Sequence, residues 1–304
     1  MARGYRRDEA IIGNGVFAGG EFQMSKDRLQ ERIRMLAEVE GDIEVISLEQ
    51  VKVLSSELGL SLKEVELAAL EACVLPRRYL RNLGTVGWDG QARLLRSTVA
   101  VVGLGGLGGY VVEALARVGV GRLVLIDGDA FVDHNLNRQM FATESNLGSS
   151  KVQAAGARVA GINSAVEVVG HAVEATPENL PRLLEGSDVV VDALDRLPTR
   201  IMLQEEARRQ GIPLVHGAIG GMVGQVMTIF PGDEGLYALY GRGEVPERGI
   251  EVELGCPTTT PMMVASWQAQ EVMKILAGIG EPLRHRLLLI DAEAGIVDVI
   301  RPGI

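Results

Sequence analysis

The chain of 304 residues is long enough for one large globular domain plus a small extension, and its 47% hydrophobic content can supply a buried core. A formal net charge of −10 argues against a surface built for nucleic acid or an anionic membrane, so neither is expected as a partner. The two cysteines, Cys73 and Cys256, are too few for a disulfide framework or a cysteine zinc site, and they predict a cytoplasmic protein.

The first part of the chain predicts an arm followed by a helical extension. Residues 1–24 are polar and rich in glycine, which is typical of a flexible arm. Helical patterns dominate residues 25–77, where Ser47 with Gln50 and Ser61 with Glu64 have the spacing of capping boxes. The acidic character of this extension argues against DNA binding, so we expect it to dock onto the main domain or a partner.

Strand and helix patterns then alternate along the main domain. The expected strands are 98–102, 122–127, 166–171, 188–193 and 213–217, and the expected helices are 107–118, 150–161, 177–185 and 197–210. This alternation predicts an α/β fold with a doubly wound, mostly parallel sheet. A strand at 222–230 follows without a helix, so the C-terminal part becomes antiparallel. A loop over 231–257, a helix over 258–276 and a hairpin of strands 286–291 and 296–300 complete the chain.

A glycine-rich turn joins the first strand of this sheet to its helix. Gly103, Gly105 and Gly108 have the spacing G-x-G-x-x-G, with Gly106 between them, and the missing side chains allow a tight turn and close approach of a ligand. The helix that follows offers unpaired N–H groups and the positive end of its dipole to an anion. The turn therefore predicts a phosphate cradle in a Rossmann-like fold.

A carboxylate at the end of the second strand extends this nucleotide site. Asp127 stands where a ribose-binding acid belongs, although an ordinary strand-end acid is the alternative. NAD and ATP fit equally well up to this point, because each carries a ribose and phosphates.

Two cations and a second acid favour ATP. Arg138 and Lys151 are suited to hold the β- and γ-phosphates as a leaving group during attack at the α-phosphorus. Asp195 follows another strand, at the edge where open α/β sheets bind ligands, and a hard carboxylate there suits Mg²⁺. The alternatives are solvated charges for Arg138 and Lys151 and a helix N-cap for Asp195.

Seven motifs in order resemble the ThiF/MoeB/HesA family, the bacterial relatives of ubiquitin-activating enzymes, from about residue 78 onward. They are Arg78-Tyr-Leu-Arg81-Asn82, Gly103-Leu-Gly-Gly-Leu-Gly108, Asp127-Gly-Asp129, Asn135-Leu-Asn-Arg138-Gln139, Gly148-Ser-Ser-Lys151, Asp192-Ala-Leu-Asp195 and Ser266-Trp-Gln268-Ala-Gln-Glu271. The resemblance implies that residues 78–304 form an ATP-binding adenylation domain.

The resemblance also implies an activity, a partner and roles for individual residues. Enzymes of this family use ATP to adenylate the C-terminal carboxylate of a small ubiquitin-like or sulfur-carrier protein ending in Gly-Gly, and they release pyrophosphate. It implies that Arg81 reaches the ATP site of a neighbouring subunit, which predicts a homodimer. The remaining assignments are the ribose for Asp127, the phosphates for Asn135, Arg138 and Lys151, magnesium for Asp195, and further nucleotide contacts for Asp129 and Gln139.

Three departures from the family pattern qualify this picture. Many members hold a structural zinc with two Cys-x-x-Cys pairs, but Tyr237-Ala-Leu-Tyr240 lies near the first position and the C-terminal tail lacks cysteine, so no zinc site is expected. Arg196 replaces the asparagine that often follows Asp195, which puts nucleotide contacts there in question. Cys256 lies at a helix start rather than at the usual nucleophile position, and we favour a small buried residue over a catalytic thiol.

Two other functions remain as alternatives. One is a nucleotide-binding relative without catalysis, motivated by Arg196 and the missing zinc cysteines. The other is an NAD-dependent oxidoreductase, which the glycine turn and Asp127 allow, although no proton donor for hydride transfer is recognisable. Within the family, activation of a small-molecule or tRNA carbonyl would use the same adenylation machinery.

Overall fold

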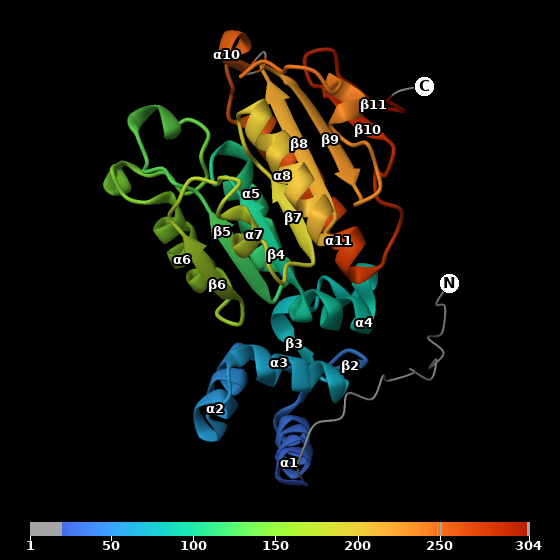
Figure 1. Ribbon diagram of the computed structural model, residues 1–304. Helices are drawn as coiled ribbons and strands as arrows, with labels where there is room; N and C mark the ends of the chain where they lie inside the picture. The colour runs from blue at the N-terminus through green and yellow to red at the C-terminus, as the bar shows by residue number, and fades with distance from the viewer. Residues whose placement is uncertain (1–19, 248, 250, 303–304) are drawn as a thin grey trace.

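The computed structural model describes residues 20–247, 249 and 251–302 and shows one large sheet covered by helices, with a smaller unit at one end (Figure 1). The large sheet has eight strands in the order β11-β10-β9-β8-β7-β4-β5-β6. Its parallel strands are β4 (Thr98–Val102), β5 (Arg122–Ile126), β6 (Glu167–His171), β7 (Val189–Asp192) and β8 (Leu214–Gly220). The predicted doubly wound, mostly parallel sheet is confirmed.

The C-terminal part of the sheet is antiparallel, as expected. β9 (Val223–Ile229) pairs with β8, and the hairpin β10 (Leu287–Asp291) and β11 (Ile296–Ile300) continues the sheet to its edge. The segment between β9 and the last long helix contains two short helices, α9 (Tyr237–Tyr240) and α10 (Glu251–Leu254), where a loop was expected.

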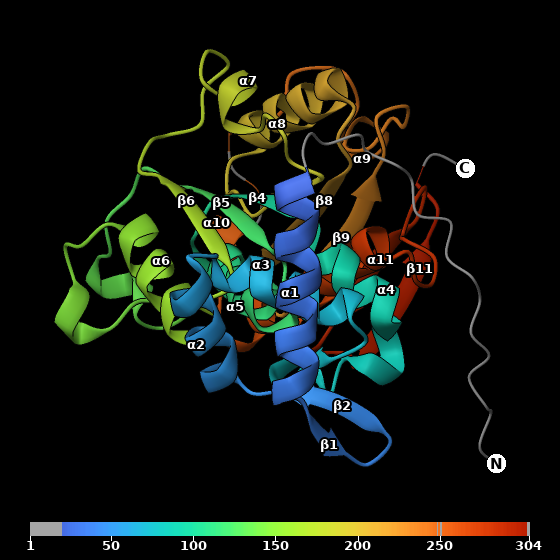
Figure 2. The same ribbon diagram turned by 90° about the horizontal axis from the view of Figure 1, so that it is seen from below.

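Helices cover both faces of the sheet. α4 (Leu83–Arg96), α5 (Gly106–Val118), α6 (Lys151–Ile162) and α11 (Thr259–Ala277) share one hydrophobic cluster with the sheet, and α7 (Leu180–Leu183) and α8 (Leu197–Gln210) share the other. Figure 2, seen from below, places α7 and α8 at the top of the view, beyond the sheet. Among the described residues, no helix is long and apolar enough to cross a membrane.

The helix expected over 177–185 is much shorter than predicted. α7 spans only four residues, because Pro181 restricts the helix to a start just before it, where proline fits the first turn, and Gly186, with φ 73°, ends the segment in a left-handed conformation. Asn179 accepts a hydrogen bond from the amide of Thr176, so a turn replaces the helix at its start.

The N-terminal unit contains the expected helices and an unexpected small sheet. Its helices are α1 (Gly20–Leu36), α2 (Leu48–Leu58) and α3 (Leu62–Glu71), and its strands are β1 (Glu38–Glu40), β2 (Ile43–Ile46) and β3 (Leu75–Pro76). Both predicted capping boxes are present. α1 begins inside the range expected to form an arm, and the rest of that range, 1–19, lies outside the described residues.

A buried hydrogen-bonded group joins this unit to the main domain. Tyr79 donates to Glu66 of α3 at 2.9 Å and accepts from Asn163, at the end of α6, at 3.0 Å. Arg78 pairs with Glu66 and donates to Asn163. The first recognised motif therefore holds the two units together.

Candidate nucleotide site

The glycine turn between β4 and α5 combines positions closed by protein with positions open to a ligand. A Cβ at Gly103, which has φ 92°, would lie 2.5 Å from the carbonyl oxygen of Ala193, and one at Gly108 would lie 1.9 Å from that of Gly103. These two glycines allow close backbone packing. At Gly105 the nearest atom to an added Cβ is Gln139 Nε2 at 3.6 Å, so space remains above the start of α5.

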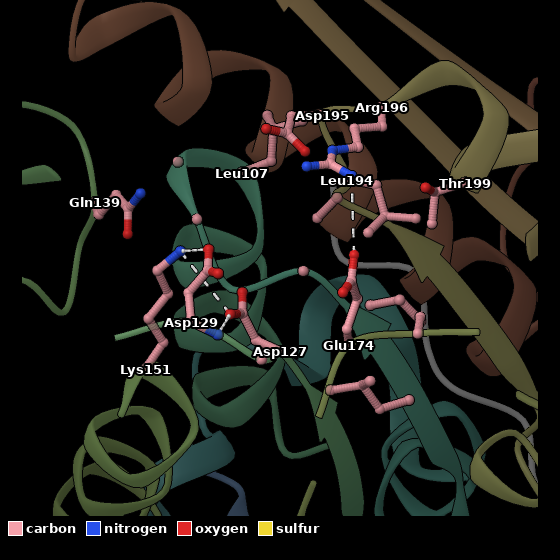
Figure 3. A pocket seen from close by; sticks show the side chains of 18 of the residues that line it. Leu107, Asp127, Asp129, Gln139, Lys151, Glu174, Leu194, Asp195, Arg196 and Thr199 are labelled. Atoms are coloured by element: carbon pink, nitrogen blue, oxygen red, sulfur yellow. Dashed lines mark hydrogen bonds and ion pairs between the residues drawn. The ribbon is translucent and has the colours of Figure 1, made fainter. Parts of the chain in front are cut away.

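A cavity of about 1170 Å³ opens in front of this turn, at the carboxyl ends of the parallel strands. Residues from the ends of β4, β5, β6 and β7 line it (Figure 3). Of the predicted site residues, it brings together Gly103, Gly105, Gly106, Asp127, Asp129, Arg138, Gln139, Lys151 and Asp195.

Asp127 and Lys151 lie at one end of the cavity, together with Asp129. Asp127 accepts hydrogen bonds from the amides of Leu104 at 2.6 Å and Asp129 at 2.8 Å. Burial raises the pKa of Asp127, although Lys151 and the two amides act in the opposite direction. Lys151 is only 5% exposed, so it is not a solvated surface charge.

Arg138 and Gln139 lie on the segment that faces the glycine turn. Arg138 donates to the carbonyl of His134 at 2.7 Å and to Asn137 Oδ1 at 2.8 Å, so protein acceptors hold its guanidinium. Gln139 is buried, and its Oε1 has no hydrogen-bond partner among the described residues. This buried acceptor fits a ligand hydroxyl, because an unpaired buried polar atom is costly.

Asp195 and Arg196 approach the cavity from the turn after β7. Asp195 is exposed, and the N-cap position of α8 is Arg196, so Asp195 lies one residue too early to cap that helix. Arg196 lies 3.9 Å from Glu174, across the cavity in Figure 3, and 3.6 Å from Glu247. The residue that departs from the family pattern therefore lines the predicted nucleotide site.

Three predicted residues lie outside the cavity lining. Gly108 packs inside the turn, and the side chain of Asn135 is buried and accepts from the amide of Val132 at 3.1 Å. Arg81 precedes Asn82, whose side chain donates to the carbonyl of Val118 at the C-terminal end of α5. The cavity lies at the opposite end of this 13-residue helix, about 20 Å away.

The cavity also contains residues that the sequence did not indicate. Glu174, Thr199 and Arg200 line it, but none belongs to a recognisable motif. Cys256, which was expected to be a small buried residue, instead lines the cavity and is only half-buried, and its carbonyl accepts from Asn137 at 3.3 Å. Asn137 also lines the cavity, and it could have been predicted as a site residue, because it lies within the motif that contains Arg138.

The cavity fits a nucleoside triphosphate and a magnesium ion. The open start of α5 suits phosphates, and Asp127 with Gln139 suits a ribose. Asp195 supplies one hard carboxylate, which is sufficient for Mg²⁺ when phosphates and water complete its coordination. Within the described part of the chain, no three His, Cys, Asp or Glu side chains cluster as a metal site, and the expectation of no zinc stays a prediction.

The fold and this cavity define a doubly wound nucleotide-binding protein. The ThiF family model matches residues 79–303, and the chain belongs to the ThiF family. The family that the seven motifs predicted is therefore confirmed.

Individual relatives and a solved structure agree with this membership. The chain is 42% identical over 222 residues to the SAMP-activating enzyme E1 of Haloferax volcanii, covering 71% of this chain and 81% of the relative. It is 39% identical over 227 residues to the sulfur carrier protein adenylyltransferase of Thermus thermophilus, covering 71% and 83%. It spans about half the length of two maize adenylyltransferase and sulfurtransferase MOCS3 proteins. Escherichia coli MccB, solved with MccA-N7isoASN, shares the fold with a TM-score of 0.66 at 18% identity, covering 93% of this chain and 87% of that one.

Proposed function

We propose that this protein is an ATP-dependent adenylyltransferase that activates the C-terminal carboxylate of a small ubiquitin-like or sulfur-carrier protein ending in Gly-Gly. Residues 78–304 form the adenylation domain and residues 25–77 an extension to it. The observation that carries the proposal is the convergence of the open glycine turn, Lys151 and Asp195 on one cavity. The names of the two relatives, which refer to a SAMP and to a sulfur carrier protein, support the choice of substrate.

The reaction requires positioning and charge stabilisation more than proton transfer. A carrier carboxylate oxygen forms a bond to the α-phosphorus of ATP while the bond from that phosphorus to the pyrophosphate oxygen breaks, giving an acyl adenylate. The nucleophile is already ionised, so no protein base is needed. Lys151 and Arg138 stabilise the charge of the departing pyrophosphate, and the amides at the start of α5 hold the phosphates.

Asp195 would hold a magnesium ion, which neutralises phosphate charge when bound. Arg81 serves the site of a second subunit in a homodimer, because its own cavity lies at the far end of α5. We place the reaction in the cytoplasm, in keeping with the low cysteine content.

Two measurements test this function. Mg-ATP should raise the thermal unfolding temperature more than NAD does, because only a bound ligand stabilises the folded state. ATP–pyrophosphate exchange should then require a carrier with an intact Gly-Gly end and cease when those two glycines are removed. Stabilisation by NAD without exchange would replace the proposal with a dinucleotide-dependent activity.

A nucleotide-binding protein without catalysis is the second candidate. Arg196 favours it, because it lines the cavity directly after Asp195 where the family often has an asparagine, and it pairs there with Glu174 and Glu247. Stabilisation by ATP with no exchange for any Gly-Gly carrier would support this candidate.

A further inference from the structure

A row of four polar side chains crosses the sheet beside the turn that carries Asp195. Asp192, His216 and Gln225 come from the neighbouring strands β7, β8 and β9, and Tyr240 comes from the short helix α9. Asp192 and His216 are partner residues of the parallel pair β7 and β8, and Gln225 lies diagonally from His216 on antiparallel β9. The row therefore connects the buried end of β7 with the segment 231–257.

Hydrogen bonds run through the whole row. His216 Nδ1 lies 2.7 Å from Asp192 Oδ2, and Gln225 Nε2 lies 3.3 Å from His216 Nε2 and 3.0 Å from the Tyr240 hydroxyl. Because the amide nitrogen of Gln225 only donates, His216 Nε2 accepts and His216 Nδ1 donates to Asp192. Burial lowers the pKa of His216, in agreement with a neutral ring.

The row ends at the backbone of the Asp195 turn. Asp192 Oδ1 accepts from the amide of Leu194 at 3.1 Å, and Arg200 donates to the carbonyl of the same residue. On the other face of the sheet, Gln268 of α11 donates to the carbonyl of Asp192 at 2.8 Å. The residue that follows Leu194 is Asp195, so these bonds hold the backbone immediately before it.

We propose that His216 and Gln225 are positioning residues for Asp195 and that they couple the placement of Tyr240 to the magnesium-binding turn. The inference rests on the proposed function, because it takes Asp195 as the magnesium ligand. A buried polar network in which every group has its hydrogen-bond partner holds one rigid arrangement. A network that lacks some of these bonds is less rigid. His216 and Asp192 are fully buried, so water does not reach the bond between them.

The test compares magnesium dependence with nucleotide binding. Gln225→Met keeps the length of the side chain but removes both donated hydrogen bonds. The Mg²⁺ concentration that half-maximally tightens ATP binding, measured by calorimetry, should rise about tenfold, as for other groups that orient metal ligands. The ATP dissociation constant in EDTA should stay unchanged. In the nucleotide-free chain, the amide of Leu194 should exchange hydrogen faster.

Two tyrosine variants of α9 provide a matched pair. Tyr240→Phe removes the outermost hydroxyl of the row and should raise the Mg²⁺ requirement less than Gln225→Met does. Tyr237→Phe, on the same short helix, should leave it unchanged, since the Tyr237 ring lies against Arg242 instead. Because Tyr240 is exposed, its variant folds even if a buried substitution does not.

A double-mutant cycle with Asp195→Asn decides the outcome. The inference requires that Gln225→Met has no further effect on Mg²⁺ dependence once Asp195 is replaced. Equal effects in the presence and absence of Asp195 would overturn it while leaving the proposed function intact. ATP binding with no Mg²⁺ dependence in the unaltered chain would overturn the magnesium role and this inference together.

Discussion

Lys151 Nζ lies 2.7 Å from Asp129 Oδ2, and this contact holds a buried cation at one end of the nucleotide cavity. Lys151 is also the first residue of α6, where the helix dipole disfavours positive charge. Two carboxylates offset that cost, because Asp127 Oδ1 lies 3.9 Å from the same nitrogen. The arrangement keeps a positive charge in the cavity, where the proposed function requires one for the departing pyrophosphate.

Lys151→Met should therefore remove leaving-group stabilisation while keeping the aliphatic stem. We expect ATP–pyrophosphate exchange to fall about 10²–10³-fold, the usual loss for one electrostatic group of this kind. Lys63→Met is the matched control, since Lys63 pairs with Glu167 outside the cavity lining. Exchange that persists in Lys151→Met would exclude the assigned role.

Substitutions at two glycines of the turn should affect different properties, one the stability of the fold and the other the binding of ATP. Gly108→Ala brings a Cβ 1.9 Å from a carbonyl oxygen and should lower the free energy of unfolding by about 1–3 kcal/mol or more through overpacking. Gly105→Ala meets no atom closer than 3.6 Å and should fold normally, but its methyl group takes space at the phosphate cradle. Urea unfolding and ATP calorimetry distinguish the two. Equal stability of both variants would contradict the assignment of Gly108 to packing and Gly105 to binding.

The sequence predicted those parts of the site that depend on local pattern. Asp127 and Lys151 follow from the end of a strand and the start of a helix, which short-range periodicity identifies. The contact of Arg196 with Glu174 depends on the distance between two loops, and that of Asp192 with His216 on strand register, which no local pattern contains. The hairpin of β1 and β2 had a local signal, Gly41 with φ 65° in its turn, but the surrounding helical pattern obscured it.

Shared sites in a homodimer should allow two inactive chains to restore activity. Arg81→Ala and Lys151→Ala each inactivate a site, but a mixed dimer contains one site with both residues intact. Mixing the two variants should recover up to about a quarter of the exchange activity, if the chains pair at random and each site works independently. Mixing Lys151→Ala with Asp195→Ala is the control, because both residues line the same cavity and no intact site should form. Absence of rescue in the first mixture would contradict a trans role for Arg81.

The stabilising contacts of Asp233, at the start of the segment 231–257, should be lost at acidic pH. Asp233 is buried and accepts from the amide of Phe230 at 3.0 Å and from Arg284 Nη2 at 2.8 Å, with His285 Nε2 at 3.4 Å. Burial alone would raise the pKa of Asp233, but the bonds from Arg284 and Phe230 outweigh it and hold the pKa below its ordinary value of 3.8. The ionised form therefore stabilises the folded state.

Asp233→Asn should lower the free energy of unfolding by about 1–2 kcal/mol at pH 7, toward the low end for charged hydrogen bonds because Arg284 is half exposed. A carboxyl whose pKa is lower in the folded state stabilises the protein fully at a pH above its pKa in the unfolded state. That stabilisation is lost as the pH falls through its pKa in the folded state. The difference between the two chains should thus persist at pH 5 and shrink below 3.8. Urea unfolding at pH 7, 5 and 3 measures it, with the exposed Asp42→Asn as control. A difference that grows on acidification would mean that Asp233 is protonated in the folded protein, and the ion pair would then not hold this segment.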